Sequence, residues 1–414
     1  MTTIAPNFGT AARPDHVPPE LVYDFDYTAP IPKGEDNYTV LKRMQDAGHD
    51  IVWTPRNGGH WVVTRAEDIK WVQENFQIFS HEVFTIPRGT VKVIMPPLTV
   101  DPPLHARYRA IFNPFMSPSK VATMTDKARK LAIELIEKIK PQGRCEFVED
   151  FAHVLPVVMF LGIVDLPVER RLEFIEWGVA FSNATNQVDR DRALKPIVEY
   201  LQSVLNERYR NPGDDLLSAI AKWRDNERFA GGQAGEAEII GMALLIFFGG
   251  LDTVASALSF AARHLAQHPA HRRRLLEDRE VIPRAVEEYL RRHGLSNTGR
   301  LIKQDVERKG VRMKADEMVM VPIGCSSVDE RVYPDPFTVN FDRPENFVKG
   351  VPAHNTFGNG PHKCVGAPLA RAEMRIFFEE WLPRIPDFRL DPAHDIVVHM
   401  GSVPGIDRLH LVFE

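Results

Sequence analysis

One cysteine of this chain lies in a segment rich in glycine. The segment FGNGPHKCVG places three glycines, a proline, His362 and a lysine around Cys364. Glycine at positions 358 and 360 can adopt positive φ and allows a tight turn. The residues after the cysteine have an amphipathic helical pattern, so Cys364 is expected at or just before a helix N-terminus. Unpaired N–H groups and the helix dipole lower the pKa of a thiol there. The pattern predicts a loop that holds a thiolate.

A thiolate at this position is compatible with three kinds of chemistry. It can be a nucleophile with His362 as its base, a redox thiol, or a ligand of a metal ion. A redox role lacks a resolving partner, because Cys145 and Cys325 are far away in the sequence and no CxxC pair occurs. The same spacing argues against a disulfide framework and against a zinc site built on thiolates. A buried cysteine without chemistry is the fourth interpretation.

A second group of residues lies inside the longest helical pattern, which runs from about residue 236 to 268. The sequence FFGGLDTVAS at its centre places Gly249 and Gly250 next to Asp252 and Thr253. Such a helix is roughly 45 to 50 Å long and crosses a whole domain. Two adjacent glycines cost a helix roughly 1 kcal/mol each relative to alanine, so something requires a thin or bent backbone here. Close helix packing is one explanation, and space for a bound molecule is the other.

Two further pairs of charged residues share helix faces. EEYLRR places Glu288 and Arg291 three residues apart, and DPPLHARYR places His105 and Arg109 four residues apart. Residues at these spacings lie on the same side of a helix. Each pair alone is typical of an ordinary surface contact.

The segment FGNGPHKCVGAPLAR resembles the haem-binding loop of the cytochrome P-450 monooxygenases in its phenylalanine, glycines, basic residue and cysteine at these spacings. The resemblance covers nearly the whole chain. It implies one domain, residues 1–414, mainly α with small β-sheets, with haem b between the long central helix and the helix after the cysteine. The Cys364 thiolate would bind the haem iron, which in that family favours O–O cleavage. Buried haem propionates require cationic partners. The implied cofactor contacts are Cys364, His105, Arg109, Arg300, His362, Gly249 and Phe357.

The resemblance also implies roles for the other groups. Asp252 would relay protons from solvent, and Thr253 would hold a water or donate through its hydroxyl, as general acid catalysts for oxygen activation. The alternative is that Asp252 is a paired structural carboxylate and that Thr253 bonds back to its own helix. Glu288, Arg291 and Arg343 correspond to a structural Glu-Arg-Arg core that supports the cysteine loop.

Several stretches, among them HVPPELVYDFD, NGGHWVVTR and RIPDF, resemble most the bacterial camphor-hydroxylating branch of the family. That branch is soluble and takes electrons from NADH through a flavin reductase and a 2Fe-2S ferredoxin. The tyrosine that holds the camphor ketone is absent here, and Val93 stands nearest to its place, so a ketone would lose about 1 to 3 kcal/mol. We expect another small apolar terpenoid, a monoterpenoid such as cineole or a norisoprenoid such as an ionone. The implied pocket walls are Phe84, Val93, Leu245, Phe248, Ser296, Thr298 and Val403.

Three basic residues are candidates for the docking of an acidic ferredoxin. Lys363, Lys70 and Arg107 would form a basic patch on the cysteine side of the haem, or they are solvated side chains without a partner. Two alternatives to an O2-dependent monooxygenase are a peroxygenase driven by H2O2 and a haem-thiolate sensor or carrier. The first suits sites in which the acid and alcohol are replaced, and the second usually brings an output domain.

The composition is that of an ordinary globular protein. The 414 residues are 44% hydrophobic and 26% charged, and the net charge of -5 argues against nucleic acid as the main partner. No signal peptide is readable, and the apolar run Ile239–Phe248 is too short to span a bilayer, so we expect a cytoplasmic protein and a monomer. Helical patterns dominate residues 115–295, including 118–141 and 194–212. The β-rich segments are expected near the N-terminus and in 295–414, for example at 319–323 and 409–413.

Overall fold

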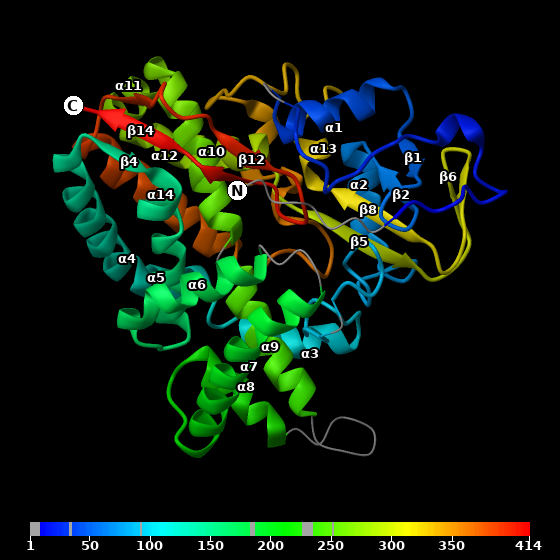
Figure 1. Ribbon diagram of the computed structural model, residues 1–414, viewed down its shortest axis with the longest axis horizontal. Coiled ribbons are helices and arrows are strands. Elements are labelled where there is room, and N and C mark those ends of the chain that lie inside the picture. Colours follow the sequence, from blue (N-terminus) through cyan, green and yellow to red (C-terminus); the bar gives the residue numbers. More distant parts are fainter. Residues whose placement is uncertain (1–8, 33–34, 92, 183–186, 226–234, 251) are drawn as a thin grey trace.

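The computed structural model describes residues 9–32, 35–91, 93–182, 187–225, 235–250 and 252–414 (Figure 1). Within them, a mainly helical part and a smaller part built around sheets lie on opposite sides of the view in Figure 1. The predicted class, mainly α with small β-sheets, is confirmed. The α-helices are α1 Asn37–Asp46, α2 Ala66–Glu74, α3 Leu104–Phe112, α4 Pro118–Ile139, α5 Val154–Ile163, α6 Arg171–Ser182, α7 Gln187–Arg210, α8 Leu216–Ala221, α9 Glu236–Gly249, α10 Asp252–Gln267, α11 Pro269–Glu277, α12 Ile282–Arg292, α13 Ile323–Ser327 and α14 Ala367–Arg384.

The strands form small sheets. In the largest, the order is β1-β2-β8-β5-β3, and all neighbours are antiparallel except β2 and β8, which are parallel. Every residue of β1, β2 and β8 is buried, as expected for strands covered on both faces. The strands are β1 Ile51–Thr54, β2 His60–Val63, β3 Phe79–Ser80, β4 Arg144–Glu146, β5 Asn297–Ile302, β6 Val306–Arg308, β7 Val311–Met313, β8 Met318–Pro322, β9 Phe347–Val348, β10 Val351–Pro352, β11 Phe388–Leu390, β12 Val397–His399, β13 Gly405–Arg408 and β14 His410–Phe413.

The helical part has its own large apolar core. Helix α4 begins where the Ser117 side chain accepts a hydrogen bond from the Lys120 N–H, and its buried positions recur three or four residues apart. Helices α4 to α12 occupy residues 118–292, close to the predicted helical segment. Two elements depart from the predicted division into a helical segment and β-rich segments. Strand β4 lies in the helical segment and pairs with β14, and helix α14 lies in the C-terminal segment and packs against α4. Their apolar faces are buried by partners distant in the sequence.

The central helical pattern forms two helices that follow one another, α9 and α10. The predicted helix over 236–268 corresponds to Glu236–Gln267, with α9 ending at Gly249 and α10 beginning at Asp252. Residue 251 lies outside the described residues. Taken together, the two helices are long and apolar enough to cross a membrane, which the shorter run Ile239–Phe248 is not, and 59% of the apolar window is buried inside the protein. Burial within the core accounts for this apolar character.

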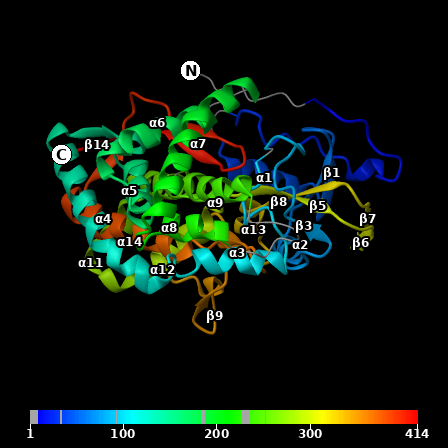
Figure 2. The ribbon, with the colours of Figure 1, turned by 90° about the horizontal axis from the view of Figure 1, so that it is seen from below.

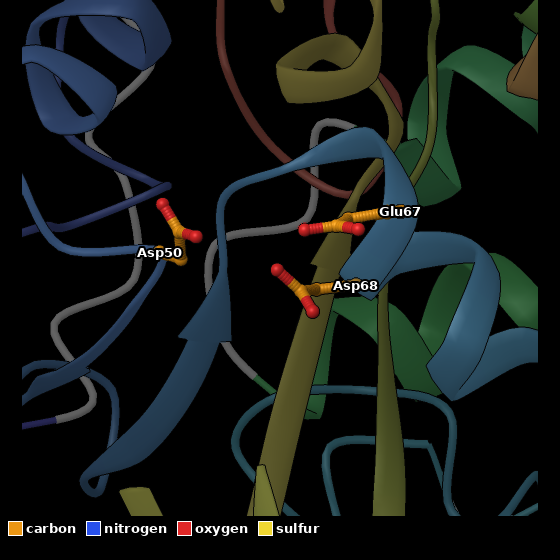
Figure 3. A group of neighbouring side chains, drawn as sticks. All are labelled: Asp50, Glu67 and Asp68. Carbon is orange, nitrogen blue, oxygen red and sulfur yellow. The ribbon is translucent and has the colours of Figure 1, made fainter. Parts of the chain in front are cut away.

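Three carboxylates, from Asp50, Glu67 and Asp68, point toward a common centre beside the largest sheet (Figure 3). Such a group can hold a metal ion, but here it surrounds an ammonium group. The Lys309 Nζ lies 2.7 Å from Asp50 and 2.7 Å from Asp68, and it also contacts Glu67. Although burial alone would lower it, these carboxylates raise the pKa of Lys309. The cluster fastens the β6–β7 hairpin to α2.

Candidate functional site

The cysteine loop ends where α14 begins. Cys364 lies three residues before the first residue of that helix, as predicted, and its N–H donates to the Phe357 carbonyl at 2.8 Å. The backbone N–H groups of Gly366 and Ala367 donate to the sulfur. Cys364 retains accessible surface, although the protein atoms around it are dense enough to raise the pKa of the thiol.

Glycine is required at two positions of this loop. Gly358 has φ +70° and Gly360 has φ +67°, so the prediction of positive φ is confirmed at both. A Cβ on Gly360 would lie 2.6 Å from the Gln73 carbonyl oxygen, closer than any side chain tolerates. The loop is therefore pressed against the end of α2, where Asn359 Nδ2 also donates to the Gln73 side chain at 2.9 Å.

The prediction that this position lowers the thiol pKa is wrong for the protein by itself. Burial raises the pKa of Cys364, and the N–H groups of Gly366 and Ala367 and the charge of Arg109 offset this only in part. The physical reason is desolvation, which the sequence pattern does not report. A metal ion deprotonates a coordinating thiol outright, so the thiolate form depends on a bound cation.

Three histidines and an arginine gather next to the loop. The His362 ring stacks on His81 at 3.8 Å and lies 4.3 Å from His105. The His362 Nε2 lies 3.4 Å from an Asp101 oxygen. Burial lowers the pKa of His105 to about 4 and that of Arg300 to about 9. His81 and Asp101 were not predicted to take part, because they precede the predicted helix and carry no recognisable spacing.

Some nitrogen atoms of this cluster have no hydrogen-bond partner among the described residues and are available to bind an anion. Arg300 Nη1 donates to Thr298 at 2.9 Å and to the Gly299 carbonyl at 2.7 Å, whereas its Nε finds no partner among the described residues. The buried Nδ1 of His81 is likewise unpaired within that part of the chain. The cluster thus offers more donors than the Asp101 carboxylate satisfies. A ligand with carboxylates, such as haem, fits these residues.

Arg109 contacts the loop itself, and its charge also acts on His105 and His362. Its Nη2 donates to the Lys363 carbonyl at 2.5 Å, and burial lowers its pKa while the charge of Cys364 acts in the opposite direction. The structure therefore places Arg109 beside the sulfur and its loop, and His105, His362 and Arg300 in the histidine cluster.

The two glycines of the central helices have different surroundings. A Cβ on Gly250 would contact the Ile246 carbonyl oxygen at 3.5 Å and the Phe160 side chain at 3.7 Å, whereas a Cβ on Gly249 would meet no atom within 4 Å. Close packing therefore explains Gly250, and open space lies beside Gly249. The Thr253 hydroxyl contacts the Gly249 carbonyl at 3.4 Å, which is the weak back-bonding geometry of the alternative interpretation.

Comparisons with known proteins identify the family. The family model described as Cytochrome P450 matches residues 171–396, more than half of the chain. A curated relative, "Probable cytochrome P450 127A1" from Sinorhizobium fredii, is 32% identical over 412 residues, covering 97% of this chain and 96% of the relative. The chain belongs to the cytochrome P450 family. This P450 is a monooxygenase with haem as its cofactor, and the family uses O2 and a redox partner.

Solved structures give the same assignment. The crystal structure of CYP101J2 matches with a TM-score of 0.87 and 33% identity, covering 98% of this chain and all of that one. The crystal structure of CYP101C1 matches with a TM-score of 0.87 and 32% identity over 97% of this chain. These proteins share one fold over nearly their full length.

The P450 has a cavity of about 630 Å³ next to the segment that leads into α3. Of the seven predicted wall residues, Phe84 and Val93 line this cavity. The Phe248 ring instead packs on Phe181 at 4.3 Å, and Thr298 accepts the hydrogen bond from Arg300. Leu245, Ser296 and Val403 are partly buried and do not line this cavity either. Lining residues that the sequence did not indicate include Leu104, Tyr108 and Glu238.

Glu288, Arg291 and Arg343 form a buried ion-pair network. Arg291 Nη2 lies 2.6 Å from Glu288, and Arg343 Nε lies 3.3 Å from the same carboxylate, with all three side chains at most 5% exposed. A second network, not indicated by the sequence, joins Arg371 of α14 to Glu287 of α12 at 2.6 Å. The second network connects α12 to α14, the helix that follows the loop.

Proposed function

We propose that Cys364 is the haem ligand of this P450 and that the histidine cluster with Arg300 and Arg109 holds the haem carboxylates. The observation that carries this proposal is the position of an accessible cysteine beside a cationic cluster whose donors are unpaired among the described residues. When bound, haem supplies the oxygen chemistry of the family. The loop N–H groups hydrogen-bond the sulfur and thereby adjust its donor strength. The whole chain, residues 1–414, acts as one domain in this proposal.

We further propose that Asp252 and Thr253 deliver protons for oxygen activation, as general acids on the α10 side of the site. Open space beside Gly249 supports a site for O2 there. The Thr253 hydroxyl makes only a long contact within its helix, so it is able to exchange that contact for a water. Because the acid and alcohol pair is present, a peroxygenase or a sensor is the weaker alternative.

Thr253→Ala tests this role. In a monooxygenase the variant retains haem but releases reducing equivalents as peroxide, so product formed per NADH consumed falls. Ser259→Ala is the matched control, since Ser259 also bonds back to its own helix, at 2.7 Å to the Ala255 carbonyl, and is fully buried. Unchanged coupling in Thr253→Ala would refute the proton-delivery role.

For the substrate, we propose a small apolar terpenoid, a monoterpenoid or norisoprenoid. Phe84, Val91, Val93 and Leu104 give the cavity apolar walls, and its volume is within the range of about 300 to 1,000 Å³ usual for ligand sites. Titration of cineole, ionone and camphor into the holoenzyme, followed by the low-to-high-spin change of the haem spectrum, tests this class. A steroid or fatty acid that binds more tightly than all three contradicts it.

For the electron donor, we propose a 2Fe-2S ferredoxin with an acidic surface, reduced by an NADH-dependent flavin reductase in the cytoplasm. Lys363 and Arg107 are exposed on the cysteine loop and on α3, and Lys70 lies on α2, which touches that loop. Figure 2 shows the β9–β10 hairpin projecting on the side where α3 lies. In this proposal the P450 acts as a monomer.

A charge reversal tests the docking surface. Lys363→Glu is expected to slow reduction by ferredoxin several-fold at low salt and to weaken the dependence on ionic strength. Lys195→Glu on α7, whose side chain is 74% exposed, is the matched control. A reduction rate that is indifferent to salt in the unmodified protein contradicts the basic patch.

A further inference from the structure

His399 lies where the last hairpin of the chain meets the start of α10. It ends strand β12 and pairs with Gly405 of β13. A Cβ on Gly405 would lie 2.7 Å from His399 Cε1 and 2.8 Å from the Ser256 hydroxyl, so the imidazole and Ser256 lie close together over this glycine. Ser256 follows Asp252 by four residues and therefore shares its helix face. The hairpin thus brings His399 next to the acid end of α10.

The neighbours of the His399 ring favour its doubly protonated form. Its Nδ1 lies 2.8 Å from an Asp407 carboxylate oxygen, and its Nε2 lies 3.0 Å from the Val403 carbonyl oxygen. A carbonyl and an ionised carboxylate accept hydrogen bonds but do not donate them. The Val403 carbonyl needs a proton on Nε2, and the Asp407 carboxylate beside Nδ1 favours a second proton, so these neighbours favour the cationic ring. The His399 and Asp407 side chains are 41% and 40% exposed, so the pair has access to solvent.

Titratable groups from three elements surround this ring. The charges of Asp252 on α10 and Asp407 on β13 act on this ring, and His153, just before α5, is in charge interaction with His399 and with Glu149. Burial alone would lower the pKa of His399, but Asp407, the Val403 carbonyl and Asp252 together raise it above 6.5. Burial lowers the pKa of His153, so the two imidazoles shift in opposite directions.

We propose that His399 is a positioning residue that, held by Asp407, keeps a positive charge beside Asp252 and makes proton supply through Asp252 depend on pH. This inference rests on the proposed proton-delivery role of Asp252. The charge is present below the pKa of His399 and is lost as pH rises through it. Proton supply through Asp252 is therefore expected to weaken on the alkaline side.

The first test measures the charge directly. In the reduced, CO-bound holoenzyme, the imidazole signals of His399 are titrated by NMR in the unmodified protein, in Asp407→Asn and in Asp252→Asn. The pKa of His399 is expected above 6.5 and to fall by about one unit in each variant, because each removes a nearby negative charge. His394, which lies 3.1 Å from Asp391, is the internal reference. A His399 titration unaffected by Asp252→Asn overturns the proposal.

The second test follows product formed per NADH between pH 6 and 9. His399→Gln is expected to lower coupling several-fold at neutral pH and to remove its alkaline decline, while His399→Lys, a cation over this whole range, retains coupling at high pH. His394→Gln, the same change at another histidine and aspartate pair, should match the unmodified protein. If His399→Lys behaves like His399→Gln at every pH, the charge has no role.

The two proposals fail differently. If Asp252→Asn and Thr253→Ala leave coupling intact, the proton-delivery role itself is wrong. If both variants uncouple the reaction while coupling and its pH profile are unchanged in His399→Gln, only the role of His399 is wrong. The CO spectrum of each variant shows whether haem and its ligand are retained.

Discussion

The cysteine loop and the junction of α9 and α10 both carry chemistry, yet their surroundings differ. Around the loop, Gly360 is pressed against α2, the Cys364 N–H is bonded at 2.8 Å, and Arg371 ties α14 to α12. At the junction, Gly249 has open space and Thr253 makes one long contact. A metal ligand must be held in place, whereas oxygen and protons need room and exchangeable contacts. The difference separates a rigid side from an adaptable side of one site.

Removal of the sulfur is expected to have the largest effect. Cys364→Ala should abolish the long-wavelength Soret band of the CO complex and lower activity by more than about 100-fold, the upper limit for losing a group that only supports a ligand. Cys145→Ala is the control, since Cys145 is a buried free cysteine that lies in β4 and not in the loop. A Cys364→Ala protein that keeps the band would show that another group binds the iron.

Loss of the buried Glu288, Arg291 and Arg343 network is expected to have the next largest effect. Glu288→Gln leaves Arg291 and Arg343 buried without their carboxylate, so the free energy of unfolding is expected to fall by about 3 to 5 kcal/mol. Urea unfolding of the holoenzyme measures this. Glu173→Gln breaks the exposed pair with Arg170, also three residues apart, and should cost less than about 1 kcal/mol. Equal losses in the two variants would contradict the distinction between buried and exposed pairs.

Adding a methyl group at Gly360 tests how closely the cysteine loop approaches α2. Gly360→Ala should lower the free energy of unfolding by about 1 to 3 kcal/mol, because alanine disfavours positive φ and its Cβ meets the Gln73 carbonyl. Gly89→Ala, at φ +87° with no atom within 4 Å, carries the backbone cost alone. Thermal unfolding compares the two variants. If Gly360→Ala is no less stable than Gly89→Ala, the loop moves to accommodate the added Cβ.

A substitution at Gly249, on the adaptable side, should change the free energy of unfolding least. Gly249→Ala adds a Cβ where nothing opposes it, so helix propensity is expected to raise the free energy of unfolding by up to about 1 kcal/mol. The same methyl group narrows the open space, so coupling to product should decline although the protein is no less stable. A destabilised Gly249→Ala protein would indicate that this position is packed after all.

The elements that bear the chemistry were predictable because their signals are local. The three- and four-residue spacing of apolar residues predicts the helix over 118–141, which is α4, and the glycines at 358 and 360 predict positive φ within the loop. Contacts between distant segments were not. Nothing near His81 in the sequence indicates that its ring stacks on His362, and nothing near Phe248 indicates that it packs on Phe181.

The sequence by itself determined which residue types stand at the ligand loop and on the central helices, since backbone conformation and helix faces follow from neighbours along the chain. Only the tertiary structure decided how readily these groups ionise and which charges lie near one another. Burial makes the Cys364 thiol harder to ionise, and the last hairpin brings His399 to α10 across more than 140 positions of the chain. The strength of an electrostatic interaction depends on distance in space and on exclusion of water, and the fold sets both.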